Sequence, residues 1–387
     1  MLPKGTLLYA MYASVGAVSQ LLIDATVNQA IMGIAVDERV ALPSFVFFAL
    51  ESQRQDVVAT ANSSTQANLN AQKVRNISIP HPDIETQHAI VRYLDHAEMR
   101  IARAIQAKSE IVRLLQEARA AIISEAVLGV GMEQAEPETY GSLSEVRVLE
   151  WLGSVPSSWK RSSIAGCFYE NREMNSSLRE GTVLSLSFGR VIVKPAERLH
   201  GLVPSSVAGY QIVNPGYIVI RPTDLQNDKT SLRVGLVANR GIITSAYMAL
   251  IPRSGIDPDF ASLLLSTYDF SKIFYGYGSG LRQNLSFSDI KHIPVMVPAL
   301  QVQREIVENV AKRTSHIERA HRSALTEIDL LHEFRTRLIA DVVTGKKDVR
   351  AEAASLPDVD PLELARVLSG ASVIEEDVEE EVGANGD

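Results

Sequence analysis

One stretch of sequence decides the fold, and it occurs twice. Residues 77–129 read ISIPHPDIETQHAIVRYLDHAEMRIARAIQAKSEIVRLLQEARAAIISEAVLG, and residues 293–345 read IPVMVPALQVQREIVENVAKRTSHIERAHRSALTEIDLLHEFRTRLIADVVTG. Placed 216 positions apart, the copies align without a gap and share 15 identities over 53 positions. This period is far longer than a solenoid repeat of a few tens of residues. The sequence therefore predicts a duplicated unit, a globular domain followed by a long helix, with pseudo-two-fold symmetry.

Each copy has the apolar periodicity of a helix that pairs with another helix. From Ile90 to Ile122, apolar residues recur at spacings of four and three, which is typical of a coiled coil. Gly129 and Gly345 follow the two patterns and are suited to end a helix. We therefore predict helices over 84–128 and 300–344, packed as an antiparallel coiled coil. The side chains predicted to form the helix interface are Ile90, Leu94, Ile101, Ile111, Leu115, Ile122, Ile306, Val310, Ile317, Leu331 and Leu338.

The segments before the helices are expected to form α+β domains of unequal size. Gly5 and Gly216 each precede a strand-like run, but four residues precede Gly5, whereas about 66 residues separate Gly216 from the start of the second domain pattern at Glu150. We therefore expect a partial first domain, truncated at its N-terminal side. The predicted boundaries are a partial domain at 1–83, a helix at 84–131, a linker at 132–147, a complete domain at 148–299, a helix at 300–346 and an acidic, disordered tail at 347–387. Within that tail one helix is expected near 361–368.

Composition restricts the class of protein. The single cysteine, Cys167, excludes a disulfide framework and fits a reducing cytoplasm. The N-terminus lacks a signal-peptide pattern, and the densest apolar run, 42–50, is too short to span a bilayer. The net charge is −8, but residues 351–387 carry −10, which leaves +2 for the other 350 residues. A nucleic-acid site would therefore have to be a local patch on a nearly neutral body.

Known catalytic patterns are absent from the sequence. Asn214-Pro215-Gly216-Tyr217 resembles the Asn-Pro-Pro-Tyr loop of amino-methyltransferases, but glycine replaces the second proline and no glycine-rich cofactor loop follows an early strand. There is no P-loop, and the eight histidines include no His-x-x-x-His or His-Glu-x-x-His pair. We therefore expect no catalytic residue, no metal site and no cofactor in this chain.

Polar segments of the second half carry side chains suited to DNA. Arg, Gln and Asn can make bidentate contacts with base edges, and Lys, Ser and Thr can contact phosphates. The segments are 221–233, 278–284 with its first-half counterpart 62–68, and 189–194; ordinary surface loops are the alternative interpretation. The candidate DNA contacts are Arg190, Lys194, Arg221, Thr223, Gln226, Asn227, Lys229, Ser231, Arg233, Arg282, Gln283, Asn284, Thr65, Gln66 and Asn68.

These patterns together resemble the DNA-specificity subunit of type I restriction–modification systems, over the chain up to about Val349. The resemblance rests on the Ile-Pro-x-Pro motif of 79–82 with Gln87, its counterpart at 293–303, and the segments 64–69, 184–190, 223–229 and 278–285. It implies two target-recognition domains, joined by the helical spacer, each reading one half of a split site on double-stranded DNA.

The same resemblance implies partners that perform the chemistry. Two methyltransferase subunits would bind the spacer and carry S-adenosylmethionine, and restriction subunits, with ATP and Mg²⁺, would join them. This chain would then be a cytoplasmic, non-catalytic subunit without a membrane segment. The alternative is a catalytic DNA methyltransferase or a fused restriction–modification enzyme, and the missing cofactor loops count against it. A third interpretation is a pure coiled-coil scaffold, and the two polar domains count against that one.

Overall fold

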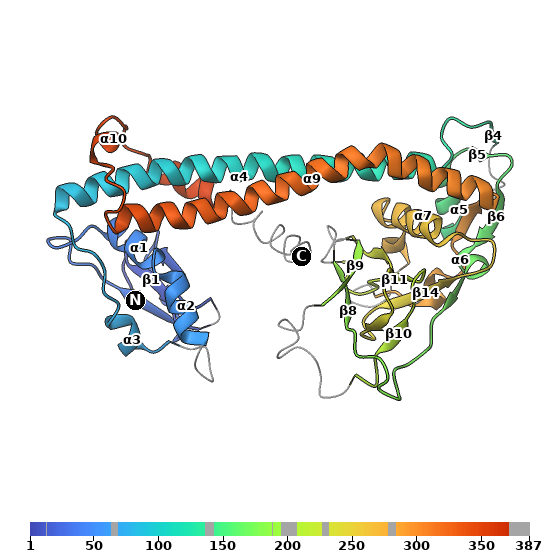
Figure 1. Cartoon of the computed structure of the whole chain (residues 1–387), viewed down its shortest axis with the longest axis horizontal. Coiled ribbons are helices and arrows are strands. Elements are labelled where there is room, and N and C mark those ends of the chain that lie inside the picture. Colours follow the sequence, from blue (N-terminus) through green and yellow to red (C-terminus); the bar gives the residue numbers. More distant parts are fainter. Residues whose placement is uncertain are drawn as a thin grey trace. The chain divides into compact units, whose positions relative to one another are not determined.

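The computed structural model of the chain describes residues 1–12, 14–62, 69–135, 143–187, 189–194, 207–226, 232–277 and 284–370. These residues form two compact units, one of 1–111 with 323–370 and the other of 112–322. Each unit contains a domain of helices and strands and parts of two long helices, α4 (Ile84–Val127) and α9 (Leu300–Val343) (Figure 1). The predicted α+β class is confirmed.

Helices α4 and α9 each span 44 residues and pack antiparallel, as predicted. Ion pairs between them show the direction, because residue numbers fall on α9 as they rise on α4. The pairs in the first unit are Glu98–Arg335 (2.8 Å) and Lys108–Glu327 (2.5 Å). Those in the second unit are Arg119–Glu318 (3.4 Å) and Glu125–Arg313 (2.9 Å).

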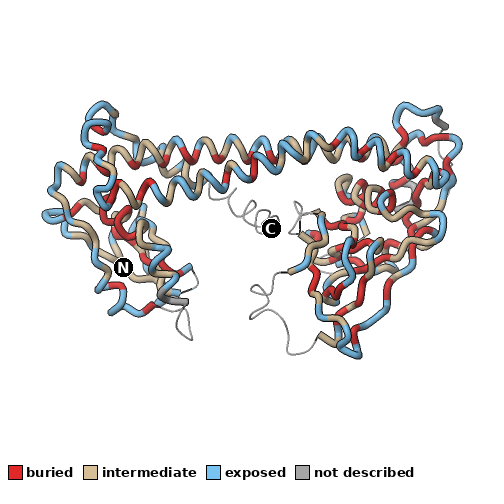
Figure 2. The backbone as a smooth tube through the Cα atoms, viewed as in Figure 1, coloured by how far each residue is buried: buried red, intermediate tan, exposed pale blue. Residues whose placement is uncertain are grey.

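The buried face of α4 departs from the predicted heptad in one place. Buried residues recur along both long helices (Figure 2). Ile111 is 43% exposed and does not belong to the interface, whereas Ile105, Ser109 and Val112 are buried. The reason is geometric: a straight helix has 3.6 residues per turn, so a strict 3.5-residue pattern drifts around it by about 20° per heptad. Of the other predicted interface residues, Ile90, Leu94, Ile101, Ile306, Val310 and Leu338 are buried, and Leu115, Ile122, Ile317 and Leu331 are half-buried.

The first domain is built on a three-stranded antiparallel sheet in the order β2-β1-β3. The strands are β1 (Leu7–Ala10), β2 (Val18–Gln20) and β3 (Ile31–Ile34), and the helices are α1 (Pro43–Glu51), α2 (Arg54–Asn62) and α3 (Ala71–Arg75). Leu7 and Tyr9 of the central strand pack with Val46 and Leu50 of α1 in one apolar cluster. Alternate strand residues thus supply the core, as expected for a sheet with one covered face.

The second domain repeats this arrangement and adds to it. Its main sheet has the order β12-β11-β14-β7. The elements, in chain order, are β4 (Gln134–Ala135), α5 (Leu143–Leu152), β5 (Val155–Pro156), β6 (Lys160–Ser163), α6 (Ile164–Cys167), β7 (Phe168–Glu170), β8 (Leu184–Ser187), β9 (Arg190–Val193), β10 (Gln211–Val213), β11 (Ile218–Ile220), β12 (Val234–Leu236), β13 (Gly241–Ile243), β14 (Met248–Pro252), α7 (Pro258–Phe270), η2 (Phe274–Gly276), α8 (Phe287–Ile290) and β15 (Pro294–Val297). Its core surrounds Phe168, Phe260 and Tyr268, and the Tyr268 hydroxyl donates to the Pro294 carbonyl at 2.7 Å.

Two predicted boundaries need correction. The linker predicted at 132–147 is partly regular structure, because α5 crosses its end and buries Val148 and Leu152 in the second domain. The tail predicted to be disordered is folded over 347–370: α10 (Arg350–Ala354) was not expected, whereas the helix at 361–370 agrees with the one predicted near 361–368. Composition suggested a solvated tail, but Val349 and Ala353 are buried.

Candidate nucleic-acid interface

The segment 221–226 of the second domain is fixed to the segment that begins at Asn284. The Asp224 backbone N–H donates to the Asn284 side-chain oxygen at 3.0 Å, and the Leu285 N–H donates to the Pro222 carbonyl at 2.8 Å. Asp224 adopts a left-handed conformation with φ of 59°, which a non-glycine residue holds only where its surroundings enforce it. The described parts of the two candidate segments, 221–226 and the stretch from Asn284, are therefore joined into one braced surface.

Arg233 provides the brace from inside the domain. Its side chain is fully buried, and its guanidinium donates to the carbonyls of Arg221 (3.2 Å), Thr223 (2.7 Å) and Asp224 (3.3 Å). The Nε–H donates to the Tyr275 hydroxyl at 3.0 Å. The prediction that Arg233 contacts DNA is therefore wrong for this structure, because its donors are used inside the protein. It positions the backbone of 221–224 instead.

Two cations lie on the β8–β9 hairpin. Gly189 forms its turn with φ of 73°, where an added Cβ would lie 3.3 Å from the Leu232 side chain. Arg190 is exposed at the start of β9, and half-buried Lys194 follows β9, its backbone N–H donating to the Val183 carbonyl. The hairpin thus holds two cationic side chains on regular structure, where phosphate contacts would be positioned accurately.

The other predicted contacts have different environments. Gln226 is exposed, Asn284 is exposed while its side chain caps Asp224, and Arg221 and Thr223 are half-buried. The remaining candidates lie outside the described residues: Asn227, Lys229, Ser231, Arg282, Gln283, Thr65, Gln66 and Asn68.

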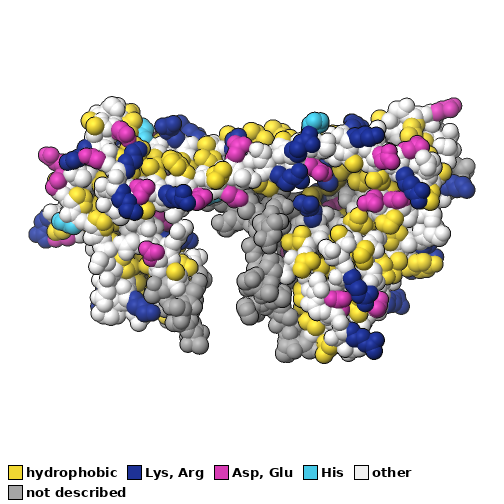
Figure 3. Space-filling model, viewed as in Figure 1, with side chains coloured by type: hydrophobic (Ala, Val, Ile, Leu, Met, Phe, Trp, Pro, Cys, Tyr) yellow, Lys and Arg dark blue, Asp and Glu magenta, His cyan; other side chains and the backbone are white. Residues whose placement is uncertain are grey.

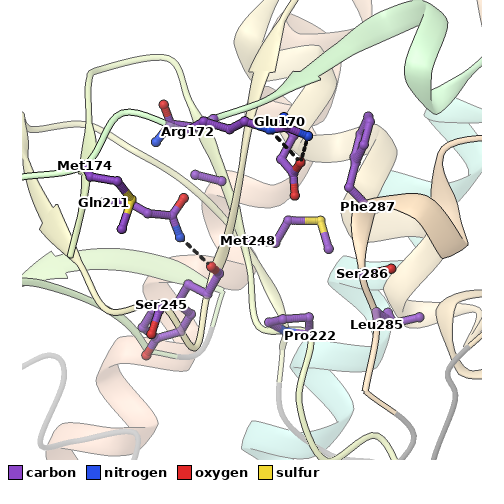
Figure 4. A pocket seen from close by; sticks show the side chains of 13 residues that line it. Glu170, Arg172, Met174, Gln211, Pro222, Ser245, Met248, Leu285, Ser286 and Phe287 are labelled. Atoms are coloured by element: carbon purple, nitrogen blue, oxygen red, sulfur yellow. Dashed lines mark hydrogen bonds and ion pairs between the residues drawn. The ribbon is translucent and has the colours of Figure 1, made fainter. Parts of the chain in front are cut away.

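An open cavity of about 470 Å³ lies beside the braced surface (Figure 4). Pro222 and Leu285 form one side, and Arg172 and Glu170, which pair at 3.1 Å, lie opposite. Gln211 donates to the Tyr247 carbonyl at 2.8 Å and lines the cavity with Met174. These lining groups are neutral or paired.

Charged and titratable side chains of the described residues are distributed as follows. Lys and Arg side chains are interspersed with Asp and Glu on the visible face (Figure 3). Burial raises the pKa of the Cys167 thiol, which disfavours the reactive thiolate. Within the described ranges no three His, Cys, Asp or Glu side chains gather as metal ligands. No described helix is both long and apolar enough to cross a membrane.

Three residues that shape this surface were not singled out from the sequence. Asp269 accepts the Arg233 backbone N–H at 2.7 Å, Tyr275 accepts from its side chain, and Asp224 carries the left-handed turn. Asp269 and Tyr275 are 36 and 42 positions from Arg233. Only the fold brings them together, and an arginine in a polar run gives no sign that it will be buried.

Comparison with known proteins agrees with this architecture. Residues 1–111 match the family model of the type I restriction modification DNA specificity domain. A structure from work on complex assembly and conformational transition of the type I R-M system has a TM-score of 0.54 at 14% identity, covering 88% of this chain and 82% of that chain. This likeness establishes a shared fold.

Two further solved structures match at lower TM-scores. One is the HsdS subunit from Thermoanaerobacter tengcongensis, at 15% identity, with 89% of this chain and 82% of that chain covered and a TM-score of 0.36. The other is the type I restriction–modification S subunit from M. genitalium, at 16% identity, with coverage of 93% and 85% and a TM-score of 0.37. The family match thus assigns a type I restriction modification DNA specificity domain to residues 1–111, and the first of these structures shares the fold of the chain.

Proposed function

We propose that this chain reads a bipartite site on double-stranded DNA, with each target-recognition domain contacting one half. The observation that carries the proposal is the braced surface of the second domain, where Arg233 holds the carbonyls of 221–224 and Asn284 accepts the Asp224 N–H. A recognition surface has to be rigid, because ordering a loop on binding costs free energy that would otherwise favour the correct sequence. Gln226 is the exposed side chain suited to a base edge, and Arg190 and Lys194 are suited to phosphates.

The DNA contacts are tested in the complex with the methyltransferase subunit. Gln226→Ala should relax the preference at one base position, with a cost of about 1–3 kcal/mol on the cognate base. Arg190→Ala and Lys194→Ala should weaken all sequences alike and lower the salt slope by about one unit each. Lys160→Ala, an exposed lysine on β6, is the control and should change nothing. If all three variants match the control, the proposed surface does not contact DNA.

We further propose that α4 and α9 dock two methyltransferase subunits. Leu114 of α4 and Leu330 of α9 occupy the same position of the repeat, and both are exposed, at 48% and 57%. Each has an exposed apolar neighbour one turn away on its helix, Ile111 and Phe334 respectively. Two repeat-related apolar positions on otherwise polar surfaces suit two copies of one partner.

Docking is tested by counting methyltransferase subunits per chain with native mass spectrometry. Leu114→Glu and Leu330→Glu should each remove one copy, and the double variant should remove both, because an unpaired charge in an apolar interface is costly. Leu362→Glu, at a leucine 77% exposed in the 361–370 helix, is the matched control. Retention of two copies by the double variant would place the interface elsewhere.

The helix pair is also proposed to set the distance between the two half-sites. Half-sites read from one face of DNA lie near a whole helical turn apart, roughly 34 Å or a multiple. Inserting one heptad into α4 and the matching heptad into α9 should change the preferred spacer length and leave the half-site bases unchanged. Altered half-site bases at an unchanged spacing would contradict this role.

Catalysis is assigned to the partners in this proposal. S-adenosylmethionine would bind the methyltransferase subunits, ATP and Mg²⁺ the restriction subunits, and the assembly would be cytoplasmic. Support comes from the sequence, which contains no P-loop and no recognisable glycine-rich cofactor loop. Methyl transfer to DNA by the purified chain alone would overturn this and favour the alternative of a catalytic methyltransferase.

A further inference from the structure

The two sheets of the duplicated domains match strand by strand. In the first domain β1 lies between β2 and β3, and in the second β11 lies between β12 and β14. Val18 of β2 and Val234 of β12 are 216 positions apart, as are Ile34 of β3 and Leu250 of β14. Ile34 pairs with Leu7 of the central strand, as Leu250 pairs with Ile218. The structural equivalence therefore extends to the register of the pairing.

The sheets differ at one edge. In the second domain β7 covers the outer edge of β14, with Leu250 opposite Glu170, Ile251 opposite Tyr169 and Pro252 opposite Phe168. In the first domain, within the residues that the structure describes, β3 pairs with β1 alone. The edge of β3 is thus equivalent to one that is occupied in the same molecule, and an unoccupied edge is a template for a further strand.

The burial of side chains points to the same difference. Met248 and Leu250 of β14 are buried, at 7% and 0% exposed, whereas their counterparts Met32 and Ile34 are only half-buried. Phe168, the inward residue of β7, is itself fully buried in the second domain. The position that corresponds to β7 therefore lies at the margin of the apolar cluster of the first domain. A strand placed there would cover the partly exposed apolar side chains of Met32 and Ile34.

The backbone groups of β3 point in the required direction. The Met11 N–H donates to the Ala30 carbonyl at 2.8 Å. Because hydrogen-bonding direction alternates along an antiparallel strand, Met32 and Ile34 bond toward β1, and Gly33 and Ala35 point outward. In the second domain the carbonyl of Ala249, the counterpart of Gly33, accepts the Asn171 N–H at 2.8 Å.

We propose that the outer edge of β3 binds an antiparallel β-strand from a partner polypeptide by β-augmentation. The segment would resemble β7, with an aromatic residue opposite Val36 pointing into the core and a residue opposite Ala35 pointing to solvent. Main-chain hydrogen bonds would provide affinity and the aromatic side chain selectivity. This inference rests on the duplication and not on DNA binding, so its test needs no DNA.

The test uses the full chain and a fluorescent peptide of residues 164–176, with Cys167→Ser to prevent oxidation. Anisotropy should show saturable binding, and hydrogen exchange should show new protection of the Gly33 and Ala35 amides. Ala35→Pro removes an outward N–H without a bond to β1, and should weaken binding about tenfold. Gln20→Pro is the matched control on the opposite edge, where the Gln20 N–H also points outward, and should bind normally.

A second experiment is designed for the case in which the free peptide binds too weakly to be detected. The same peptide is joined ahead of Met1 by a flexible glycine–serine linker, which raises its effective concentration to about the millimolar range. The tethered strand should protect Gly33 and Ala35, and a Phe168→Asp version should not. Absence of protection in both arms, or equal binding by Ala35→Pro, refutes the proposal. Concentration-dependent dimerisation that buries β3 without peptide would assign the edge to a second copy instead and would also refute it.

Discussion

Gln87 and Gln303, 216 positions apart, make the same pair of hydrogen bonds in the two halves of the molecule. Gln87 accepts the Leu42 N–H at 2.9 Å and donates to the Pro82 carbonyl at 2.9 Å. Gln303 accepts the Asp257 N–H at 2.8 Å and donates to the Pro298 carbonyl at 2.9 Å. Both glutamines are fully buried. Leu42 and Asp257 are the N-caps of α1 and α7, so each glutamine fastens a domain helix to the start of a long helix.

Replacing either glutamine should loosen its own domain and leave the other unchanged. Gln87→Leu removes the partner of the half-buried Leu42 N–H and Pro82 carbonyl, at a cost of up to about 1–3 kcal/mol for each group. Hydrogen exchange should therefore accelerate at Leu42 in Gln87→Leu and at Asp257 in Gln303→Leu. Gln301→Leu, at an exposed glutamine of the same helix turn, is the control. Acceleration at both sites in either single variant would contradict the local role.

Arg233 should affect DNA recognition without touching DNA. Arg233→Met removes the donors that hold the carbonyls of Thr223 and Asp224, so affinity for the target should fall by about 1–3 kcal/mol. The salt slope should stay unchanged, because no phosphate contact is lost. Arg233→Lys should restore only part of the lost affinity, because one ammonium group cannot replace a planar guanidinium. Arg240→Met, at a half-exposed arginine paired with Glu180, is the control; an equal loss there would show a general effect of charge.

The ion pairs between α4 and α9 should differ in strength according to burial. Glu98 is 4% exposed and pairs with Arg335, whereas Lys108 and Glu327 are 34% and 46% exposed. Arg335→Met leaves a buried carboxylate and should destabilise the first unit by about 3 kcal/mol. Lys108→Met should cost less than about 1 kcal/mol. Urea unfolding, followed by hydrogen exchange of the α4 amides, measures the loss of stability in both variants. Equal losses would show that burial does not determine the strength of these ion pairs.

Asp95 should make the first unit less stable at neutral pH than in mild acid. Burial, with a smaller effect of the Glu98 charge, raises the pKa of Asp95 to about 6, from about 3.9 in an unfolded chain. The folded state binds this proton more tightly, so its stabilisation is complete below about pH 4 and is lost as pH rises through 6. Asp95→Asn should therefore raise the free energy of unfolding by up to about 3 kcal/mol at pH 8 and change it little at pH 4.5. A pH-independent gain would contradict this assignment.

The C-terminal segment should be held on α4 by charge. Arg92 pairs with Asp358 at 3.0 Å and Arg103 with Glu363 at 2.6 Å, while Gln106 donates to the Val367 carbonyl at 2.7 Å. Arg103→Glu should raise hydrogen exchange across 357–370, because it places like charges together. Adding Glu363→Arg restores an opposite pair and should recover protection. No difference between the single and double variants would mean that charge does not hold this segment.

The sequence was sufficient for the features that depend on periodicity. The gapless repeat and the spacing of apolar residues predicted both long helices and their antiparallel packing. The helices predicted over 84–128 and 300–344 agree with the structure within one residue, whereas the boundaries set at 131 and 346 lie three to four residues beyond the helix ends. The strand-like runs after Gly5 and Gly216 located β1 and β11. These patterns are local, so they can be recognised without knowing the fold.

Long-range contacts, by contrast, were decided only by the tertiary structure. Arg233 seemed suited to DNA, but it is buried because Tyr275 and the carbonyls of 221–224 surround it. The tail seemed disordered by composition, yet Arg92 and Arg103, more than 250 positions away, pair with its carboxylates. A charged side chain is the same in sequence whether it faces water or a partner; which of these it meets depends on chain segments that folding alone brings together.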